Sequence, residues 1–103
     1  MVSRIIALFN LKPGVTPQAY ESWAKRVDLP TVNGLRSVES FEVFRSTGLL
    51  GSDAKPPYNY VEIIDVADMD MFFGDIGSEQ MQKIAAEFQA MVTDLAFINT
   101  DKL

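Results

Sequence analysis

Residues 58–66 read YNYVEIIDV, and this stretch decides the fold. It is rich in β-branched and aromatic residues and follows a Pro-Pro pair, which predicts a strand. Alternation along a strand places on one face Tyr58, Tyr60, Glu62, Ile64 and Val66. Both faces are mostly apolar, as expected of a central strand that is covered on both sides. Glu62 then lies in a buried strand, where a carboxylate is costly unless it is paired, protonated or used.

The composition narrows the possible classes of function. The 103 residues predict one domain, 1–103, and 48% hydrophobic with 22% charged residues is typical of a globular chain. A net charge of −5 argues against nucleic acid as a partner. The sequence has no Cys and no His, which excludes disulfides, thiolate chemistry and the commonest general base and metal ligand.

No segment of the sequence predicts a membrane span, a cofactor site or a metal site. The apolar run in residues 1–9, MVSRIIALF, is too short to cross a membrane and lacks a cleavage-site pattern, so we expect a cytoplasmic protein without a membrane partner. No glycine-rich phosphate loop is present, so we predict no nucleotide cofactor. Aspartates at positions 65, 68, 70 and 75 lack the spacing of a calcium loop, so we predict helix capping and no metal.

The elements follow one another in a βαββαβ order. We predict strands at 3–11, 38–45, 58–66 and 96–100, helices at 17–28 and 79–95, and a short helical turn at 68–73. The first helix begins after Thr16 and is expected to end at Leu29-Pro30, whereas Ser78 caps the second. This order predicts an α+β, ferredoxin-like fold with a four-stranded antiparallel sheet. The irregular segment 48–57 is long enough to be a binding loop or a lid.

The pattern also predicts an oligomer. Helices cover only one face of such a sheet, yet strands 3–11 and 58–66 are apolar on both faces. A second copy of the chain is expected to cover the other face, so we predict a homodimer, the dimeric α/β-barrel arrangement.

The chain also resembles a known family through several segments. They are 8–15 (LFNLKPGV), 20–23 (YESW), 28–30 (DLP), 37–43 (SVESFEV), 58–62 (YNYVE) and 86–88 (AEF). As a set they are similar to the RedY/HapK-like family of dimeric α/β-barrel proteins, over essentially the whole chain. Some relatives are thought to use a histidine, which this sequence does not contain, so carboxylates and tyrosines would carry the chemistry or the activity would differ.

The resemblance implies a role in bacterial prodiginine (prodigiosin-type) pigment biosynthesis. The protein would bind a pyrrole-containing intermediate and promote its condensation, cyclisation and dehydration to the bipyrrole without a cofactor. Two other functions stay open: a non-catalytic carrier of a bipyrrole aldehyde, and a cofactor-free monooxygenase such as related dimeric α/β-barrel proteins include.

Two carboxylates are the candidate catalytic groups. Burial in an apolar pocket would raise the pKa of Glu62 toward neutrality and suit it to general acid–base work. Alternatively, Glu62 pairs across strands with Arg4, Arg36 or Arg45. Asp28, expected at the end of the first helix, opposes the helix dipole there, so it either binds a substrate pyrrole N–H or bonds neighbouring backbone while exposed to solvent.

Aromatic residues are the candidate substrate-binding groups. Tyr20 and Trp23 lie on the apolar stripe of the first helix and either stack on a flat heteroaromatic substrate or fill the core. Tyr60, Phe41 and Phe88 carry the same two alternatives, with the core favoured for the phenylalanines.

Two polar residues complete the predicted site. Asn10 interrupts an apolar strand and either orients a ligand carbonyl or bonds backbone at the strand end. Arg45 either neutralises a carboxylate or phosphopantetheine-type anion or is a solvated cross-strand partner.

Overall fold

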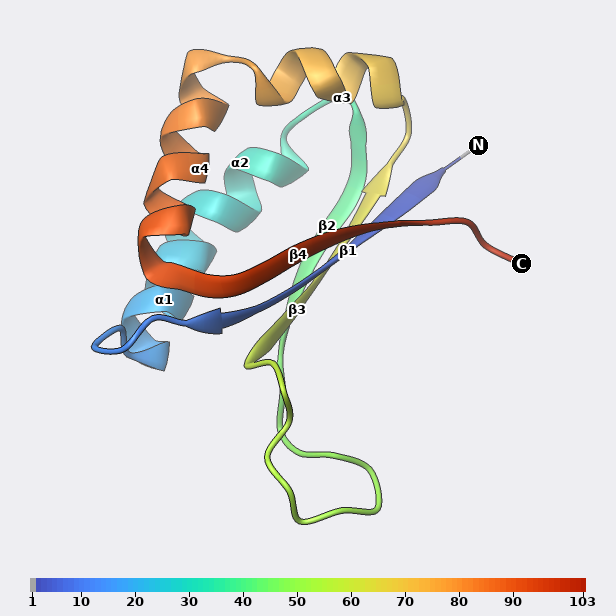
Figure 1. Ribbon diagram of the computed structural model, residues 1–103. Helices are drawn as coiled ribbons and strands as arrows, with labels where there is room; N and C mark the ends of the chain where they lie inside the picture. Colours follow the sequence, from blue (N-terminus) through green and yellow to red (C-terminus); the bar gives the residue numbers. More distant parts are fainter. Residues whose placement is uncertain (1) are drawn as a thin grey trace.

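The computed structural model describes residues 2–103 and contains one antiparallel sheet with the helices on one side of it (Figure 1). The strands lie in the order β2-β3-β1-β4. Their bounds are Ser3–Leu11 for β1, Val38–Arg45 for β2, Tyr60–Val66 for β3 and Val92–Thr100 for β4. The predicted α+β class and four-stranded antiparallel sheet are confirmed.

β3 is a central strand of the sheet, as predicted. β3 lies between β2 and β1, and Glu62 is opposite Ala7 on one side and Val43 on the other. Alternate residues of β3, from Tyr60 to Val66, are buried against the helices, as the alternation predicted. The strand begins at Tyr60 and not at residue 58; the amide of the preceding Asn59 is shared between the Phe9 carbonyl (3.0 Å) and the Asn10 side chain (2.8 Å).

The first helical segment does not end at Leu29-Pro30, so that prediction was wrong. It runs through α1 (Pro17–Trp23), a π-helical stretch η1 (Ala24–Asp28) and α2 (Leu29–Asn33). The Leu29 amide donates to the Ala24 carbonyl, five residues back. This wider turn accommodates Pro30, which has no N–H and would clash in a regular helix interior. Asp28 therefore lies inside a continuous helical segment.

The second half of the chain also differs from the prediction at its boundaries. The short turn is a full helix, α3 (Met69–Ile76), capped by Asp68. The long helix α4 (Glu79–Met91) is capped by Ser78, as predicted, but it stops earlier than residue 95. β4 begins at Val92 and not at residue 96, because its first residues pair with the end of β1. Strand pairing thus overrides the helical periodicity that continues through Leu95.

Aromatic rings fill the core between α1, α4 and the sheet. Phe9 is the centre of this cluster: its ring stacks on Tyr60 at 5.5 Å between centroids and meets the edges of Tyr20 and Phe88. Tyr20 also contacts Tyr60, with their centroids 4.7 Å apart. This cluster occupies the half of the inner sheet face that lies next to α1.

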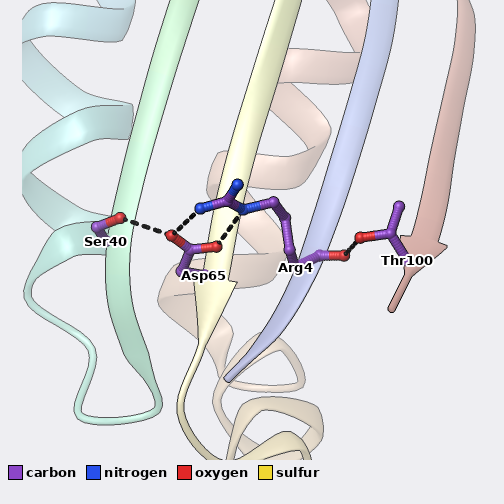
Figure 2. A network of polar contacts seen from close by, with 4 residues as sticks. All are labelled: Arg4, Ser40, Asp65 and Thr100. Carbon is purple, nitrogen blue, oxygen red and sulfur yellow. Dashed lines mark hydrogen bonds and ion pairs between the residues drawn. The ribbon is translucent and has the colours of Figure 1, made fainter. Parts of the chain in front are cut away.

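The outer face of the sheet, opposite the helices, carries both apolar residues and one polar network. The Arg4 guanidinium pairs with Asp65 (2.7 Å), which also accepts from Ser40, while Thr100 donates to the Arg4 carbonyl (Figure 2). This network spans all four strands. Around it lie half-buried or exposed apolar side chains, namely Ile6, Leu8, Phe44, Val61, Ile63, Ala96 and Ile98.

The long segment between β2 and β3 extends away from the body of the domain (Figure 1). Its tip contains a single bridge between Leu49 and Ser52. In the part of the chain described, 2–103, no helix is long and apolar enough to cross a membrane.

Candidate functional site

A cavity of about 410 Å³ lies between the inner sheet face and helices α2, α3 and α4. Three of its lining residues have polar side chains, Glu62, Asp28 and Asn99, and the rest are apolar. The apolar walls come from Ile5, Val32, Phe41, Ile64, Phe72, Ile76, Met81, Ile84, Ala85, Phe88 and Phe97. A volume of this size is ordinary for a small-molecule site.

Glu62 lies on the floor of this cavity and has no ionic partner. Its side chain is 3% exposed. Among residues 2–103, the ion pairs join Arg4 to Asp65 and Arg45 to Glu21, so the predicted alternative of a cross-strand Glu62–Arg pair is wrong. Burial, and then the charge of Asp28, raise the pKa of Glu62 from its ordinary 4.5 to about 8.

Asp28 reaches the same cavity from the π-helical stretch. It is 6% exposed and its carboxylate makes no capping hydrogen bond, so the alternative of an exposed Asp28 bonding local backbone is wrong. Burial raises the pKa of Asp28 from 3.8 to about 6. The π-turn is the local cause of this placement, and such turns often occur at functional sites.

The two carboxyl groups therefore titrate apart near neutrality. Between pH 6 and pH 8 Asp28 is ionised and Glu62 is protonated, because burial raises both pKa values and the charge of Asp28 raises that of Glu62 further. Asp28 is then the carboxyl group that ionises at the lower pH, and Glu62 the one that keeps its proton to the higher pH. A pair of carboxyl groups separated in this way can supply both an acid and a base to one ligand.

Phe41 and Phe88 line the cavity, whereas Trp23 and Tyr20 lie behind its wall. Trp23 stacks on Phe88, with ring centroids 6.3 Å apart, and donates from Nε1 to Glu87 (3.0 Å). These contacts agree with the prediction that Trp23 fills the core, where it packs against Phe88.

Tyr20 is wholly buried, and its hydroxyl is the one buried side-chain polar atom of residues 2–103 that has no hydrogen-bond partner. Its ring packs on Phe9 and Tyr60. These two residues are opposite each other in the sheet, two positions along the strands from the pair Ala7 and Glu62. Burial first, and then the charges of Glu62 and Asp28, raise the pKa of this phenol, so it stays neutral. Tyr20 is therefore a neutral, buried phenol that does not line the cavity.

Tyr60, Arg45 and Asn10 do not line the Glu62 cavity. The Tyr60 hydroxyl and the Arg45 guanidinium both donate to Glu21 of α1, each at 2.7 Å. The Asn10 amide donates to the Pro57 carbonyl (3.1 Å) and to Asp94, and it accepts from the backbone of Asn59. Asn10 thus follows its backbone-bonding alternative and fixes the base of the long loop.

Several lining residues were missed in the sequence. Phe97 and Asn99 come from β4, where they lie opposite Ala7 and Ile5. Alternation in the predicted strand 96–100, combined with pairing to strand 3–11, would have placed both on the inner face. Phe72 and Ile76 of α3 gave no such signal, because only a short turn was predicted there.

The acidic residues considered for a metal have other roles. Asp65 pairs with Arg4, Asp68 caps α3 by accepting from the Met71 amide (3.0 Å), and Asp75 accepts from Ser37 (2.6 Å). Within residues 2–103 no group of three or more acidic, His or Cys side chains is arranged to hold a metal ion.

Comparison with known proteins identifies the family of the chain. The family model described as REDY-like protein HapK matches residues 3–103. The chain belongs to this family. The crystal structure of HapK from Hahella chejuensis is similar over 100% of this chain and 93% of that chain, at 29% identity and a TM-score of 0.80. None of the curated proteins compared with the sequence matches it.

More distant neighbours share the fold alone. A dimeric ferredoxin-like protein of unknown function from Thermobifida fusca is 20% identical, with 99% of this chain and 92% of that chain covered and a TM-score of 0.77. A hydroxynitrile lyase from Passiflora edulis is 12% identical, with 96% and 91% covered and a TM-score of 0.79. Membership of the HapK family and the ferredoxin-like fold, both predicted from the sequence, are confirmed.

Glu62→Gln is expected to stabilise this HapK-family protein at alkaline pH. Between pH 4.5 and pH 8 the folded state keeps a proton on Glu62 that the unfolded chain has released, so the free energy of unfolding falls as pH rises. Gln cannot ionise and avoids this loss. We expect equal stability at pH 4 and a gain of about 2–4 kcal/mol for the variant above pH 8, measured by urea unfolding.

The exposed Glu39 of β2 supplies the matched control, since Glu39→Gln removes the same charge from the surface. A difference between Glu62→Gln and the parent that does not grow with pH would mean that the pKa of Glu62 is not raised in the folded protein.

Tyr20→Phe is expected to leave the free energy of unfolding unchanged or to raise it by about 1 kcal/mol, because it removes a buried hydroxyl without a partner. Trp23→Phe, which loses the bond to Glu87 and part of the packing on Phe88, should lower it by about 1–3 kcal/mol. A loss above about 2 kcal/mol for Tyr20→Phe in urea unfolding would show instead that the hydroxyl bonds a buried water.

Proposed function

We propose that the chain is a cofactor-free acid–base enzyme of prodiginine (prodigiosin-type) biosynthesis. It binds a pyrrole-containing intermediate and promotes condensation, cyclisation and dehydration to the bipyrrole. The observation that carries the proposal is the pair of buried carboxyl groups, Glu62 and Asp28, in one apolar cavity. Membership of the HapK family supports the pathway.

The dehydration step uses the two carboxyl groups in opposite roles. Glu62 gives its proton to the departing hydroxyl group, the C–O bond breaks, and the electron pair leaves with water. The cation that remains is delocalised over the nitrogen heterocycle. Asp28 removes a proton from the adjacent ring carbon, and the electron pair of that C–H bond forms the double bond of the aromatic pyrrole. Proton transfer from Asp28 to Glu62 then restores the starting state.

The charge of the cavity suits this intermediate. Among residues 2–103 the lining contains two carboxyl groups and no Lys or Arg, so a neutral or cationic ligand is favoured over an anion. Phe41 and Phe88 offer flat apolar surfaces for the ring, and Asn99 provides an amide at the mouth. Tyr20 does not line the cavity, and in this proposal it supports the site by packing on Phe9 and Tyr60.

We also propose that two copies assemble through the outer sheet faces. Apolar side chains from all four strands lie on that face beside the exposed Glu42, and Arg4 and Asp65 pair with each other (Figure 2). Exposed apolar surface of this extent is typical of an interface. The related Thermobifida fusca structure is described as dimeric.

Glu62→Gln should abolish turnover while binding is kept. We expect purified protein to convert the pyrrole-bearing intermediate to bipyrrole, followed by mass spectrometry, and the variant to be slower by about 10²–10⁴. The parent rate should rise with pH near 6 and fall near 8, because Asp28 must be ionised and Glu62 protonated.

Glu39→Gln is the control for that assay and should keep the parent rate. If Glu62→Gln binds the intermediate and forms product as fast as the parent, the catalytic proposal fails. The protein would then fit the carrier function, in which the cavity only shelters a reactive bipyrrole aldehyde.

Ile98→Glu should convert the proposed dimer to a monomer, measured by sedimentation equilibrium. Ile98 lies on the outer face of β4 and is 45% exposed in the single chain, so the monomer tolerates the charge while two facing copies would bury it. Phe73→Glu on α3, at a site 62% exposed, should leave the assembly unchanged. A monomeric parent protein would refute the dimer outright.

A further inference from the structure

A second hollow, of about 470 Å³, lies at the opposite end of β3 from α3. It is formed by the turn after β1, the start of α1, the end of β2 and the last residues of the long loop. We call it the Lys12 cleft. Its lining residues are Leu11, Lys12, Pro13, Gly14, Val15, Pro17, Arg45, Ser46, Lys55, Pro56, Tyr58, Asn59 and Tyr60. None of them lines the Glu62 cavity.

The Lys12 cleft has the opposite charge to the Glu62 cavity. Three cationic side chains line it, Lys12, Lys55 and Arg45, and no Asp or Glu does. This is a concentration of positive charge in a chain that has 14 acidic and 9 basic residues. It favours an anionic ligand.

Glu21 neutralises only one of these three cations. Arg45 donates to Glu21 in a two-pronged contact, Nε to Oε2 at 2.7 Å, and the Tyr60 hydroxyl donates to the same oxygen. Lys12 and Lys55 take part in no ion pair within residues 2–103. The cleft therefore keeps the charge of two ammonium groups.

The walls of the cleft are fixed by backbone hydrogen bonds. The Lys12 amide donates to the Met91 carbonyl (2.9 Å) and the Lys12 carbonyl accepts from Val15 (3.0 Å). Across the cleft, the Asn59 side chain accepts from the Leu11 amide (2.9 Å). Both sides thus hold their positions before any ligand arrives, which limits the entropic cost of binding.

Apolar and aromatic surfaces lie beside the two lysines. Tyr58 is half-buried and offers a ring face, and three prolines and Val15 supply further apolar area. A ligand that uses both surfaces needs a flat apolar body with one anionic group.

We propose that the Lys12 cleft binds a small aromatic carboxylate, with the carboxylate next to Lys12 and Lys55 and the ring against Tyr58. This site is separate from the acid–base cavity and does not depend on the function proposed for it. Glu21 limits the affinity, because it occupies the guanidinium of Arg45.

Naphthalene-2-carboxylate serves as the probe and naphthalene-2-carboxamide as its uncharged counterpart, with binding followed by amide NMR titration of the full chain. We expect the carboxylate to shift the amides of Gly14, Ser46 and Asn59 and to leave those of Phe97 and Asn99 unmoved. The carboxamide should bind more weakly by roughly tenfold. Equal binding of both probes, or shifts centred on Phe97 and Asn99, would overturn the proposal.

Charge variants test the two lysines. The double variant Lys12→Gln/Lys55→Gln should weaken carboxylate binding by roughly tenfold. Lys83→Gln/Lys102→Gln removes the same total charge from exposed positions outside the cleft and should change binding less than twofold. If both double variants weaken binding alike, the effect is one of overall charge and the site is refuted.

Glu21→Gln distinguishes a specific site in the Lys12 cleft from nonspecific binding of anions to the surface. The Arg45 guanidinium, followed by the Tyr60 hydroxyl, lowers the pKa of Glu21 to about 2, so its charge is present throughout the titration range. Its removal frees Arg45 while Gln still accepts from Tyr60, and carboxylate affinity should rise by roughly threefold to tenfold. Unchanged or weaker binding contradicts the proposal.

Inorganic phosphate at matched ionic strength tests the aromatic part of the ligand. It should fail to displace the naphthalene carboxylate at comparable concentrations, because it cannot use Tyr58 and the prolines. Displacement by phosphate at equal concentration would show that the cleft recognises an anion alone and would overturn the assignment of an aromatic ligand.

Discussion

The burial of Glu62 without a counter-ion is the constraint on which the site depends. A carboxyl group in the middle of a central strand can be accommodated only if it keeps its proton, since ionisation there is opposed by desolvation. Ala7, directly opposite in the ladder, leaves the side chain room on the inner face. The free-energy cost of ionising Glu62 in this buried position raises its pKa, so the group still carries a proton near neutral pH.

Asp28 lines the cavity from a helical segment that is distorted. A regular helix through Pro30 would place a steric clash in its own backbone, and the π-turn that avoids the clash also sets the direction of Asp28. The result is a second acid in the same cavity whose charge reinforces the protonation of Glu62. The π-helical turn in the backbone thus contributes to the raised pKa of a residue in the sheet.

The sequence was sufficient for the strands, their order and the burial of Glu62, because period-2 alternation and the Pro-Pro boundary are local signals. It was insufficient where two long-range effects compete. The apolar spacing of residues 91–95 fits a helix as well as a strand, and only pairing with β1 decides between them. Asp28 was chosen on the argument of an unfavourable helix end, yet it matters because it is inside the helix. Arg45 and Tyr60 were candidate substrate-binding groups, but both donate to Glu21, which was not among the candidate site residues.

Glu21 connects the aromatic core to the Lys12 cleft, because it accepts from both Tyr60 and Arg45. The Tyr60 ring stacks on Phe9 in the core, and its hydroxyl meets Glu21 on the other side of the aromatic cluster. Glu21 in turn pairs with the Arg45 guanidinium, which does not line the cavity that contains Glu62. A free arginine near that cavity would favour ionised Glu62 and would lower its pKa. The cations of the Lys12 cleft do not line that cavity, so the proton on Glu62 is held by burial and by the charge of Asp28, with no cation among the described residues of the lining to oppose them.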